Sequence, residues 1–385
     1  MPAPLRYRLR ADGREVAVEG DRLVDARAPF ALTLDLGAGE LRAGLINAHD
    51  HLHRNHYPRI GSPPYPDAYA WGRDLHERWA DTIARARALD RRDALLFGAL
   101  KNLISGVTTV VHHDRWEPAF ADAFPIRVAA VRTVHSLGIE PALAAQPPGD
   151  PEAPLCIHLA EGTTAAMAEE VREAERLGLL NDRLLAVHAV GVDAAGADVL
   201  VGHGVAVVWC PTSNAFLYGR TAPHGLLARA AVLLGTDSLL SGAGTLLDEL
   251  AAARATGPLS DERLLLAVGA LAAERLGAPM PVLAAGAPAD LVFLRRPVLE
   301  ATCEDVLLVV VAGVPRLADA RFAELFELAG VGTEALRVGG TDKLVAAPLG
   351  SVVARVVAEW EEAGRILEPR RAQPASGGAY ATPSA

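Results

Sequence analysis

From about residue 44 onward, the chain alternates short apolar runs with longer amphipathic segments. The runs are rich in Val, Ile and Leu, a composition that favours strands buried on both faces. Between several of them lie segments such as 164–177, where apolar residues recur near a 3.6-residue period and predict a helix. Repeated strand–helix units predict a parallel sheet, either closed or doubly wound. The predicted strands cover residues 44–51, 106–114, 126–136, 154–162, 183–191, 205–214 and 231–238.

Polar residues suited to metal binding or proton transfer stand near the C-terminal ends of several predicted strands. This arrangement is typical of a β/α barrel, which builds its active site on the C-terminal face from different strands. A doubly wound sheet is the alternative, but the Gly-rich phosphate turn expected after its first strand is absent from the sequence. We therefore predict a distorted (β/α)8 TIM barrel over residues 44–285.

The segments on either side of the predicted barrel contain short runs typical of β-strands. Arg14–Glu19 and Ala31–Leu36 are separated by turn residues and predict a small antiparallel sheet, which runs at 286–294 and 306–314 could complete. We predict that residues 1–43 and 286–345 form a small β-sandwich domain. Residues 346–385 are expected to hold a C-terminal helix and a disordered tail, because the chain from Arg365 onward is rich in Pro, Gly and small residues.

Composition and charge narrow the possible partners and location. The formal net charge is −10, whereas nucleic-acid-binding proteins usually carry a basic face, so we expect no nucleic-acid partner. The N-terminus lacks the apolar segment of a signal peptide, and no uncharged run approaches the ~20 residues that span a bilayer. Cys156, Cys210 and Cys303 are too widely spaced to suggest a disulfide framework or a zinc finger. We expect a cytoplasmic protein without a membrane segment.

The segment 46–56 contains four histidines, and two of them suit a metal site. His49 and His51 alternate along a predicted strand, so both side chains point to one face, about 6.5 to 7 Å apart. The spacing alone also admits His53. An H-x-H pair without further context can equally be two surface histidines.

Later predicted strands supply the missing context. His158, His188 and Asp237 each lie on or beside an apolar run, where a buried polar group is costly unless it is paired or coordinated. Several imidazoles with one carboxylate and an open position suit a catalytic Zn²⁺ or Fe²⁺ site better than a closed structural one.

The motifs that carry these residues resemble the amidohydrolase superfamily, in the branch of cytosine, guanine and S-adenosylhomocysteine deaminases and triazine chlorohydrolases. The motifs are GLINAHDH, IHLAEG, AVHAVG, WCPTSN and LLGTDS, and GAPADLVFL closes the region. Their order and spacing make the resemblance specific, and it extends from the leading β segment to about residue 320.

The resemblance implies a role for each matching residue. The implied metal ligands are His49, His51, His158 and Asp237. His188 would touch the metal-bound water or the substrate. Asp237 would take a proton from that water, and Glu161 would carry protons to the substrate and the departing amine. His53 and His56 lie beyond the strand end, where contact with solvent or substrate is expected instead of metal binding.

The lysine content favours one divalent metal ion per chain. Superfamily members with two metals commonly bridge them with a carboxylated lysine from the fourth strand. This sequence has only two lysines: Lys101 precedes the second predicted strand on a predicted helix, and Lys343 lies past the barrel. Zn²⁺ is the first candidate and Fe²⁺ the alternative.

Two features depart from the superfamily pattern. Only residues 137–154 separate the third predicted strand from the next, which predicts a shortened or degenerate fourth βα unit. The second departure is the pair His112 and His113 at the end of the second predicted strand, of which one is expected to face inward as a substrate contact or as a core histidine. Arg132 and Trp116 are further candidates for substrate contact.

The predicted function is a metal-dependent hydrolytic deaminase that releases ammonia from a small amino-substituted heterocycle by attack of a metal-bound hydroxide. A hydrolase of amide, ring C–N or carbon–halogen bonds is the alternative, because the same machinery attacks a similar carbon in each. A noncatalytic barrel scaffold is a remote alternative, since such proteins typically lose a ligand. The expected partner is a small-molecule substrate, and the resemblance suggests a homodimer.

Overall fold

Short parallel strands form the centre of the molecule, as the apolar runs predict. The computed structural model describes residues 4–25, 30–121 and 123–368. The central strands form two parallel sheets, one in the order β6-β7-β8 and one in the order β13-β12-β11-β10-β9. Their bounds are β6 Leu45–Asp50, β7 Val107–His112, β8 Arg127–Val128, β9 Arg132–Ser136, β10 Leu155–Leu159, β11 Leu184–His188, β12 Ala206–Trp209 and β13 Ala231–Leu234.

The predicted strand 126–136 is divided into β8 and β9, and this single segment serves both sheets. β8 pairs with β7, and β9 pairs with β10. The connection from β9 to β10 contains only the five-residue helix α4, Pro141–Ala145. The fourth βα unit is therefore reduced to one short helix, as the small number of residues before β10 predicts.

The two sheets meet again where β13 ends beside β6. The amide nitrogens of Thr236 and Asp237 donate to the carbonyl oxygen of His49 over 2.9 and 3.1 Å. Gly235 is required at this contact, because a Cβ atom there would lie 2.5 Å from the Cβ of His49. The close approach places Asp237 next to the histidines of β6.

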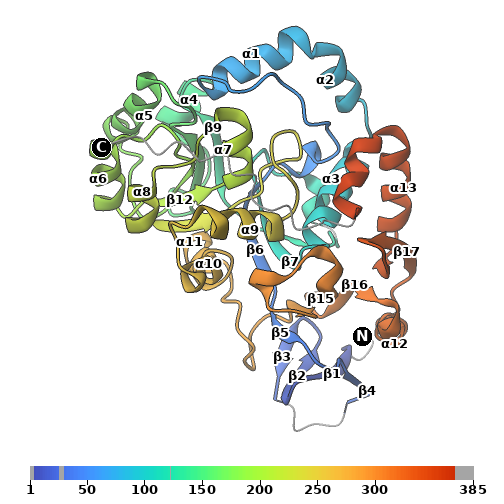
Figure 1. The fold of residues 1–385 in the computed structure, drawn as a ribbon. Helices are drawn as coiled ribbons and strands as arrows, with labels where there is room; N and C mark the ends of the chain where they lie inside the picture. The colour runs from blue at the N-terminus through green and yellow to red at the C-terminus, as the bar shows by residue number, and fades with distance from the viewer. Residues whose placement is uncertain (1–3, 26–29, 122, 369–385) are drawn as a thin grey trace.

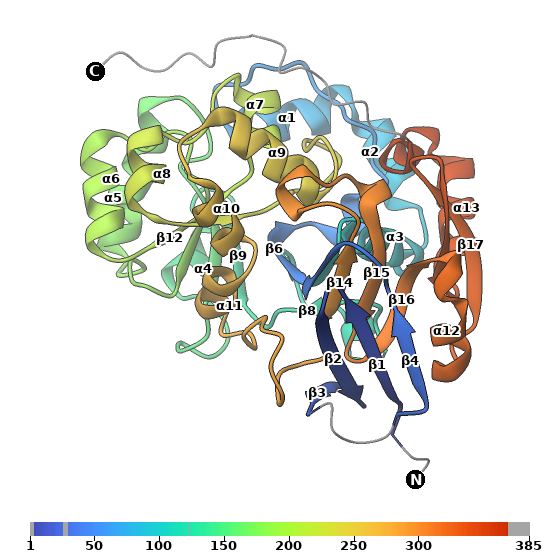
Figure 2. The ribbon, with the colours of Figure 1, turned by 60° about the horizontal axis from the view of Figure 1, so that its bottom comes forward.

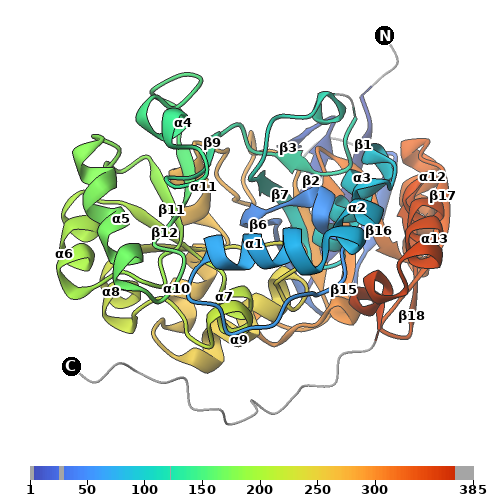
Figure 3. The same cartoon turned by 90° about the horizontal axis from the view of Figure 1, so that it is seen from above.

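Helices surround the central strands, and α1 and α2 lie at the end of the molecule opposite β1–β4 (Figure 1). The helix predicted at 164–177 is α5 and has nearly the expected bounds. Seen from above, α1 crosses in front of the central strands (Figure 3). The remaining helices of the central region are α1 Ala68–Arg78, α2 Ala80–Arg87, α3 Arg91–Leu103, α5 Ala165–Arg176, α6 Ala194–Gly202, α7 Pro211–Tyr218, α8 His224–Arg229, α9 Leu246–Thr256, α10 Asp261–Ala267 and α11 Ala270–Leu276.

The N- and C-terminal segments form a separate β structure of two sheets, with β1, β2 and β4 in front of β14, β15 and β16 in Figure 2. The first sheet has the order β3-β2-β1-β4 and the second the order β17-β18-β16-β15-β14-β5. The strands are β1 Arg6–Ala11, β2 Arg14–Glu19, β3 Arg22–Val24, β4 Leu32–Asp35, β5 Glu40–Ala43, β14 Leu291–Leu294, β15 Val306–Val311, β16 Val314–Asp319, β17 Thr333–Val338 and β18 Thr341–Ala346.

Two details of this β structure differ from the sequence-based expectation. β4 pairs with β1 in parallel, so the first sheet is mixed and not wholly antiparallel. The C-terminal strands build their own sheet, with β5 as an edge strand beside β14, instead of completing the first one. Apolar side chains from both sheets, including Tyr7, Leu9, Leu291 and Phe293, share one core, and this shared burial holds the sheets face to face.

The C-terminal part of the described chain packs against the barrel. Helix α12, Ala323–Ala329, follows β16, and α13, Leu349–Glu359, contacts α3 through a two-bond pairing of Arg355 with Asp93. A short 3-10 helix, Glu361–Leu367, includes Arg365, so the expected tail does not begin there. Residues 369–385 of that tail lie outside the described residues. Within the described ranges, no helix has both the length and the apolar character needed to cross a membrane.

Candidate metal and catalytic site

Five polar side chains from the predicted motifs meet at one end of the parallel strands. His49 lies on β6, with His51 just beyond it, while His158 lies on β10 and His188 ends β11. Asp237 follows β13. All five are at least 95% buried. Because parallel strands present their C-terminal ends to the same edge, residues far apart in sequence converge there.

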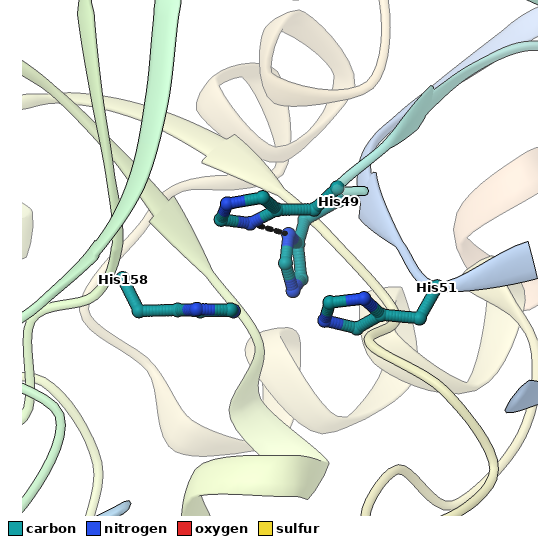
Figure 4. A group of neighbouring side chains, drawn as sticks. His49, His51 and His158 are labelled. Atoms are coloured by element: carbon teal, nitrogen blue, oxygen red, sulfur yellow. Dashed lines mark hydrogen bonds between the residues drawn. The ribbon is translucent and has the colours of Figure 1, made fainter. Parts of the chain in front are cut away.

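The nitrogen and oxygen atoms of this group lie close enough to share an ion. One atom each from His49, His51, His113 and His158 lies within 4.8 Å of the others, and the same holds for His49, His188 and Asp237. The Nε2 atoms of His49 and His51 are each 3.8 Å from Asp237 Oδ1. In Figure 4, His51 and His158 approach one another from opposite sides of the group.

The unpartnered Nε2 of His49 tests whether these residues fit a metal. This atom is buried and has no hydrogen-bond partner among the described residues, as is also true of His53 Nδ1, His56 Nδ1 and His112 Nε2, but only His49 Nε2 faces Asp237, 3.8 Å from its Oδ1. Buried polar atoms are nearly always hydrogen-bonded, so an exception requires an explanation. A cation bound among the imidazoles and Asp237 would supply the missing partner.

Oxygen acceptors fix the protonation of three of the histidines. The Nδ1 atom of His51 lies 2.7 Å from Asp114 Oδ2, that of His158 is 2.8 Å from the His135 carbonyl oxygen, and that of His188 is 2.8 Å from Asn214 Oδ1. These oxygens only accept hydrogen bonds, so each Nδ1 carries a proton, and the neutral form of each ring then has its lone pair on Nε2. The same arrangement is found around histidines that bind metals through Nε2.

Burial keeps two of these imidazoles, His49 and His158, neutral. Loss of solvent, reinforced by the neighbouring histidines, holds the pKa values of His49 and His158 well below their ordinary value. Burial alone would raise the pKa of Asp114, yet His51 and Arg54 hold it well below its usual range. A neutral imidazole with a free lone pair is the form that binds a metal.

Three donors hold Asp237 in its ionised form. The hydroxyls of Ser213 and Ser241 donate to its Oδ2 over 2.9 and 2.6 Å, and the amide of Ser238 donates to Oδ1 over 2.7 Å. Although burial opposes ionisation, His51, His188 and these hydrogen bonds lower the pKa of Asp237 to about 2. A carboxylate that stays ionised at neutral pH suits both metal binding and acceptance of a proton.

Glu161 has the opposite electrostatic environment. Burial raises its pKa above the ordinary value, even though Tyr218 donates a hydrogen bond to Oε1 over 2.7 Å. The same Oε1 atom is 3.5 Å from His188 Nε2. A carboxyl group with a raised pKa beside an ionised Asp237 forms an acid and base pair of the kind used in proton transfer.

Backbone strain is concentrated at this end of the strands. Within the described residues, Ala160, His188, Ala189 and Asp237 have φ angles of 52°, 70°, 53° and 54°. Side chains other than glycine rarely adopt this left-handed region, and its cost is tolerated mostly where function demands a particular orientation. The strain therefore coincides with the residues expected to do chemistry.

A buried lysine, for which the sequence predicted no role in the site, holds the backbone of Asp237 by a hydrogen bond. Lys101 on α3 donates to Asn55 Oδ1, Thr236 Oγ1 and the carbonyl oxygen of Asp237, over 2.8, 2.9 and 2.8 Å. Its Nζ also lies 3.2 Å from Asp50 Oδ2. Its three N–H groups thus have protein acceptors, and this leaves no donor free for another role.

A cavity of about 480 Å³ opens onto the site. His51, His158, His188, Glu161 and Asp237 line one part of it. The rest is lined by apolar side chains of α1, α2 and neighbouring loops, by three arginines, and by the histidines His53, His56, His76 and His135. The arginines are Arg54, Arg87 and Arg91.

The predicted substrate contacts are placed less favourably. Arg132 stands at the start of β9, the end away from the site, where its guanidinium donates to the carbonyls of Ala153 and Pro151. Trp116 is 55% exposed and packs against Phe120. Neither residue lines the cavity, and substrate contact by Arg132 or Trp116 stays a prediction.

The adjacent histidines of β7 are both buried and do not line the cavity. His113 joins the imidazole group, while His112 Nδ1 accepts a hydrogen bond from the amide of Leu52. Their burial agrees with the core alternative, and substrate contact by either histidine stays a prediction. His53 and His56 do line the cavity, in agreement with a position open to substrate.

Several supporting residues were missed by sequence reasoning. Asp114 had a visible signal, because it is a carboxylate directly after the buried run of β7. Asn214, Tyr218 and Lys101 had none, since their partners His188, Glu161 and Asp237 are remote in sequence. Their roles follow only from the way helices pack on the strand ends.

Comparison with known proteins gives a short sequence match and several structural relatives. A 5-methylthioadenosine/S-adenosylhomocysteine deaminase from Nitratidesulfovibrio vulgaris is 33% identical over 141 residues, which cover 34% of this chain and 31% of the relative. The match therefore spans about a third of that protein. No protein-family model matches the chain.

The fold matches solved structures over nearly the whole chain. A zinc-bound adenosine deaminase from Xanthomonas campestris superposes with a TM-score of 0.64, covering 95% of this chain and 100% of its own, at 19% identity. A triazine hydrolase from Arthrobacter aurescens gives a TM-score of 0.65, covering 92% of this chain and 99% of its own, at 20% identity. The chain thus has the fold of amidohydrolase barrel enzymes.

Proposed function

We propose that this protein is a metal-dependent deaminase of the amidohydrolase superfamily, which releases ammonia from a small amino-substituted heterocycle. The observation that carries the proposal is the joint placement of oriented imidazoles, an ionised Asp237 and a Glu161 with raised pKa beside one cavity. The sequence relative and the zinc-bound structural neighbour support the same class of reaction.

The proposed ligands of a single divalent ion, with Zn²⁺ as first candidate and Fe²⁺ as alternative, are His49, His51, His158 and Asp237. Bound there, the ion would lower the pKa of a water molecule toward ~7 and so supply a nucleophile at neutral pH. Lys101 supports a site with one metal, because its ammonium is already fully engaged.

The protein side chains divide the proton transfers between them. Asp237, ionised at neutral pH, can accept a proton from the attacking water. Glu161 can hold a proton and deliver it to a ring nitrogen and then to the departing amine. His188 presents its Nε2 lone pair beside Glu161 Oε1, where it can accept a hydrogen bond from the water and orient it.

The cavity lining supports a substrate larger than one ring. Its only carboxylates, Glu161 and Asp237, belong to the catalytic group, whereas arginines occur elsewhere in the lining. Arg54 pairs with Asp114 and Arg91 with Glu117, while Arg87 hydrogen-bonds the Tyr57 hydroxyl. We propose a heterocycle carrying a polar or anionic substituent that reaches these guanidinium groups.

A hydrolase of amide, ring C–N or carbon–halogen bonds remains the second candidate. A structural neighbour is an atrazine chlorohydrolase from Arthrobacter aurescens complexed with zinc, with a TM-score of 0.63 at 20% identity. A panel of amino- and chloro-substituted heterocycles, assayed for ammonia and for chloride, separates the two candidates. A noncatalytic scaffold is the remote alternative, and the groups of histidines and carboxylates that lie within reach of one ion count against it. We also propose a cytoplasmic location.

The variant Glu161→Gln tests the proposal. Gln keeps the shape and an acceptor for Tyr218 but cannot carry the proton, so turnover should fall by about 10²- to 10⁴-fold while zinc stays bound. Glu170→Gln is a matched control, because Glu170 is also a carboxylate of raised pKa that accepts from a tyrosine, Tyr69, yet does not line the cavity. Full activity of Glu161→Gln would remove the proton-transfer role.

A further inference from the structure

The Nδ1 atom of His49 faces a nitrogen atom of another histidine, His113, whereas the Nδ1 atoms of the other site histidines face oxygen atoms. His113 follows β7 and is 2% exposed, and its Nδ1 atom lies 3.2 Å from the Nδ1 atom of His49. Its other nitrogen, Nε2, lies 2.9 Å from the carbonyl oxygen of Val134. Two imidazole nitrogens at this distance form a hydrogen bond only if one of them carries a proton.

The carbonyl of Val134 decides which nitrogen that is. A carbonyl oxygen only accepts, so His113 Nε2 must be the protonated nitrogen of a neutral ring, and His113 Nδ1 keeps its lone pair. The His49 Nδ1 atom must then donate. The Cys156 Sγ atom, a weaker donor, also lies near His113 Nδ1, at 3.7 Å.

We propose that His113 is a positioning residue that fixes His49 in the tautomer with a lone pair on Nε2. This inference rests on the proposed metal site, and it assigns His113 to support of a ligand and not to metal binding. Each of the other three imidazoles of the site has an oxygen atom as the acceptor for its Nδ1. His113 takes the corresponding place beside the Nδ1 of His49. Removal of a partner that orients a metal-binding histidine typically weakens metal binding 10- to 100-fold.

A second group of ligand-type residues lies near this site and differs from it in the direction of its hydrogen bonds. His53, His112 and Asp114 also bring a nitrogen or oxygen atom within 4.8 Å of one another. The Leu52 amide donates to His112 Nδ1 over 3.2 Å, and Arg54 Nε donates to His53 Nε2 over 3.3 Å. The remaining nitrogens of His112 and His53 must therefore be N–H donors.

This second group offers donors and no free imidazole lone pair. Its Asp114 is already bonded to His51 and Arg54. Hydrogen-bond direction thus distinguishes histidines that can bind a metal through a free lone pair from adjacent ones that cannot, although all are of the same residue type.

The test compares two variants of similar size, His113→Asn and His113→Leu. Both lose the bond to Val134, but Asn can place Oδ1 near the former Nδ1 and so keep an acceptor for His49, whereas Leu cannot. The zinc dissociation constant, measured by chelator competition, should rise about 10- to 100-fold for Leu and much less for Asn. His112→Leu, which changes the adjacent histidine, serves as the control and should leave zinc affinity near that of the unaltered protein.

A second measurement reports the tautomer directly. Nitrogen-15 chemical shifts of the His49 ring in the metal-free protein should show a protonated Nδ1 in the unaltered chain and in His113→Asn, but mixed tautomers in His113→Leu. Unchanged zinc affinity in His113→Leu would overturn the inference. Equal losses in Asn and Leu would also overturn it, because they would make His113 a direct ligand.

Failure of the proposed function gives a different result. If the unaltered protein bound no zinc even after reconstitution, the metal site itself would be wrong. If it bound zinc and His113→Leu bound it equally well, only the role of His113 would fail. Circular dichroism of each variant confirms that the fold is retained.

Discussion

Replacement of Lys101 by Met tests the buried network behind the site. Met keeps the length and apolar stem of lysine but removes the charge and all three hydrogen bonds. The Asp50 carboxylate, which is fully buried, would lose its ion-pair partner at 3.2 Å. Removal of one partner from a buried ion pair costs roughly 3–5 kcal/mol, because the other charge stays buried and unpaired.

The expected loss in the free energy of unfolding lies near the lower end of this range. Asp50 keeps hydrogen bonds from Asn55 and Asn102 over 2.9 and 2.8 Å, so its charge remains partly solvated. The Asp237 carbonyl also keeps a hydrogen bond from Thr236 Oγ1. We expect a loss of about 3 kcal/mol in the free energy of unfolding of the metal-free protein.

The assay is equilibrium urea unfolding followed by tryptophan fluorescence and circular dichroism. In the double variant Asp50→Asn/Lys101→Met, the total cost should be smaller than the sum of the single costs by at least ~1 kcal/mol, because the unpaired charge is gone. A cost below about 1 kcal/mol for Lys101→Met would contradict the range expected for a buried pair.

Lys343→Met is the matched control, because Lys343 is the only other lysine in the chain and is also buried. Its Nζ donates to the carbonyls of Glu304 and Val306, in the β structure and away from the cavity. Both variants should lose stability, but only Lys101→Met should also weaken zinc binding, since Lys101 holds the backbone of Asp237. Equal effects on zinc affinity would refute this positioning role.

Two further outcomes are expected. Arg87→Ala should raise KM about tenfold, or ~1.4 kcal/mol, for substrates with an anionic substituent and leave the KM of neutral analogues unchanged. Steady-state kinetics on matched pairs of substrates measures this difference. Equal effects on both classes would exclude a charge contact. The metal-free protein should lose stability as pH falls below ~6.5, by about 1.4 kcal/mol per pH unit for each buried histidine. His49 and His158 have low pKa values in the folded state, so they take up protons below pH ~6.5 only when the chain unfolds. Urea midpoints at pH 7.5 and 5.5 measure this, and equal midpoints would show that the histidines are not held neutral.

Much of the barrel could be predicted because its signal is local. Runs of Val, Ile and Leu fix the parallel strands, and the small number of residues before β10 limits the fourth unit to one short helix. The division of 126–136 into β8 and β9 has no such signal, since an apolar run does not reveal that its two halves pair with different neighbours. The parallel pairing of β4 with β1 likewise depends on tertiary contacts.

The sequence by itself determined which residue types stand at the strand ends, and so which side chains could meet around a metal. Only the tertiary structure decided which of the histidines keep a lone pair for it. His49 and His53 are both histidines beside one strand, yet His113 accepts from the Nδ1–H group of the first, while Arg54 donates to Nε2 of the second. A histidine's tautomer depends on the partners that surround its ring, and folding brings those partners from elements that are remote in sequence.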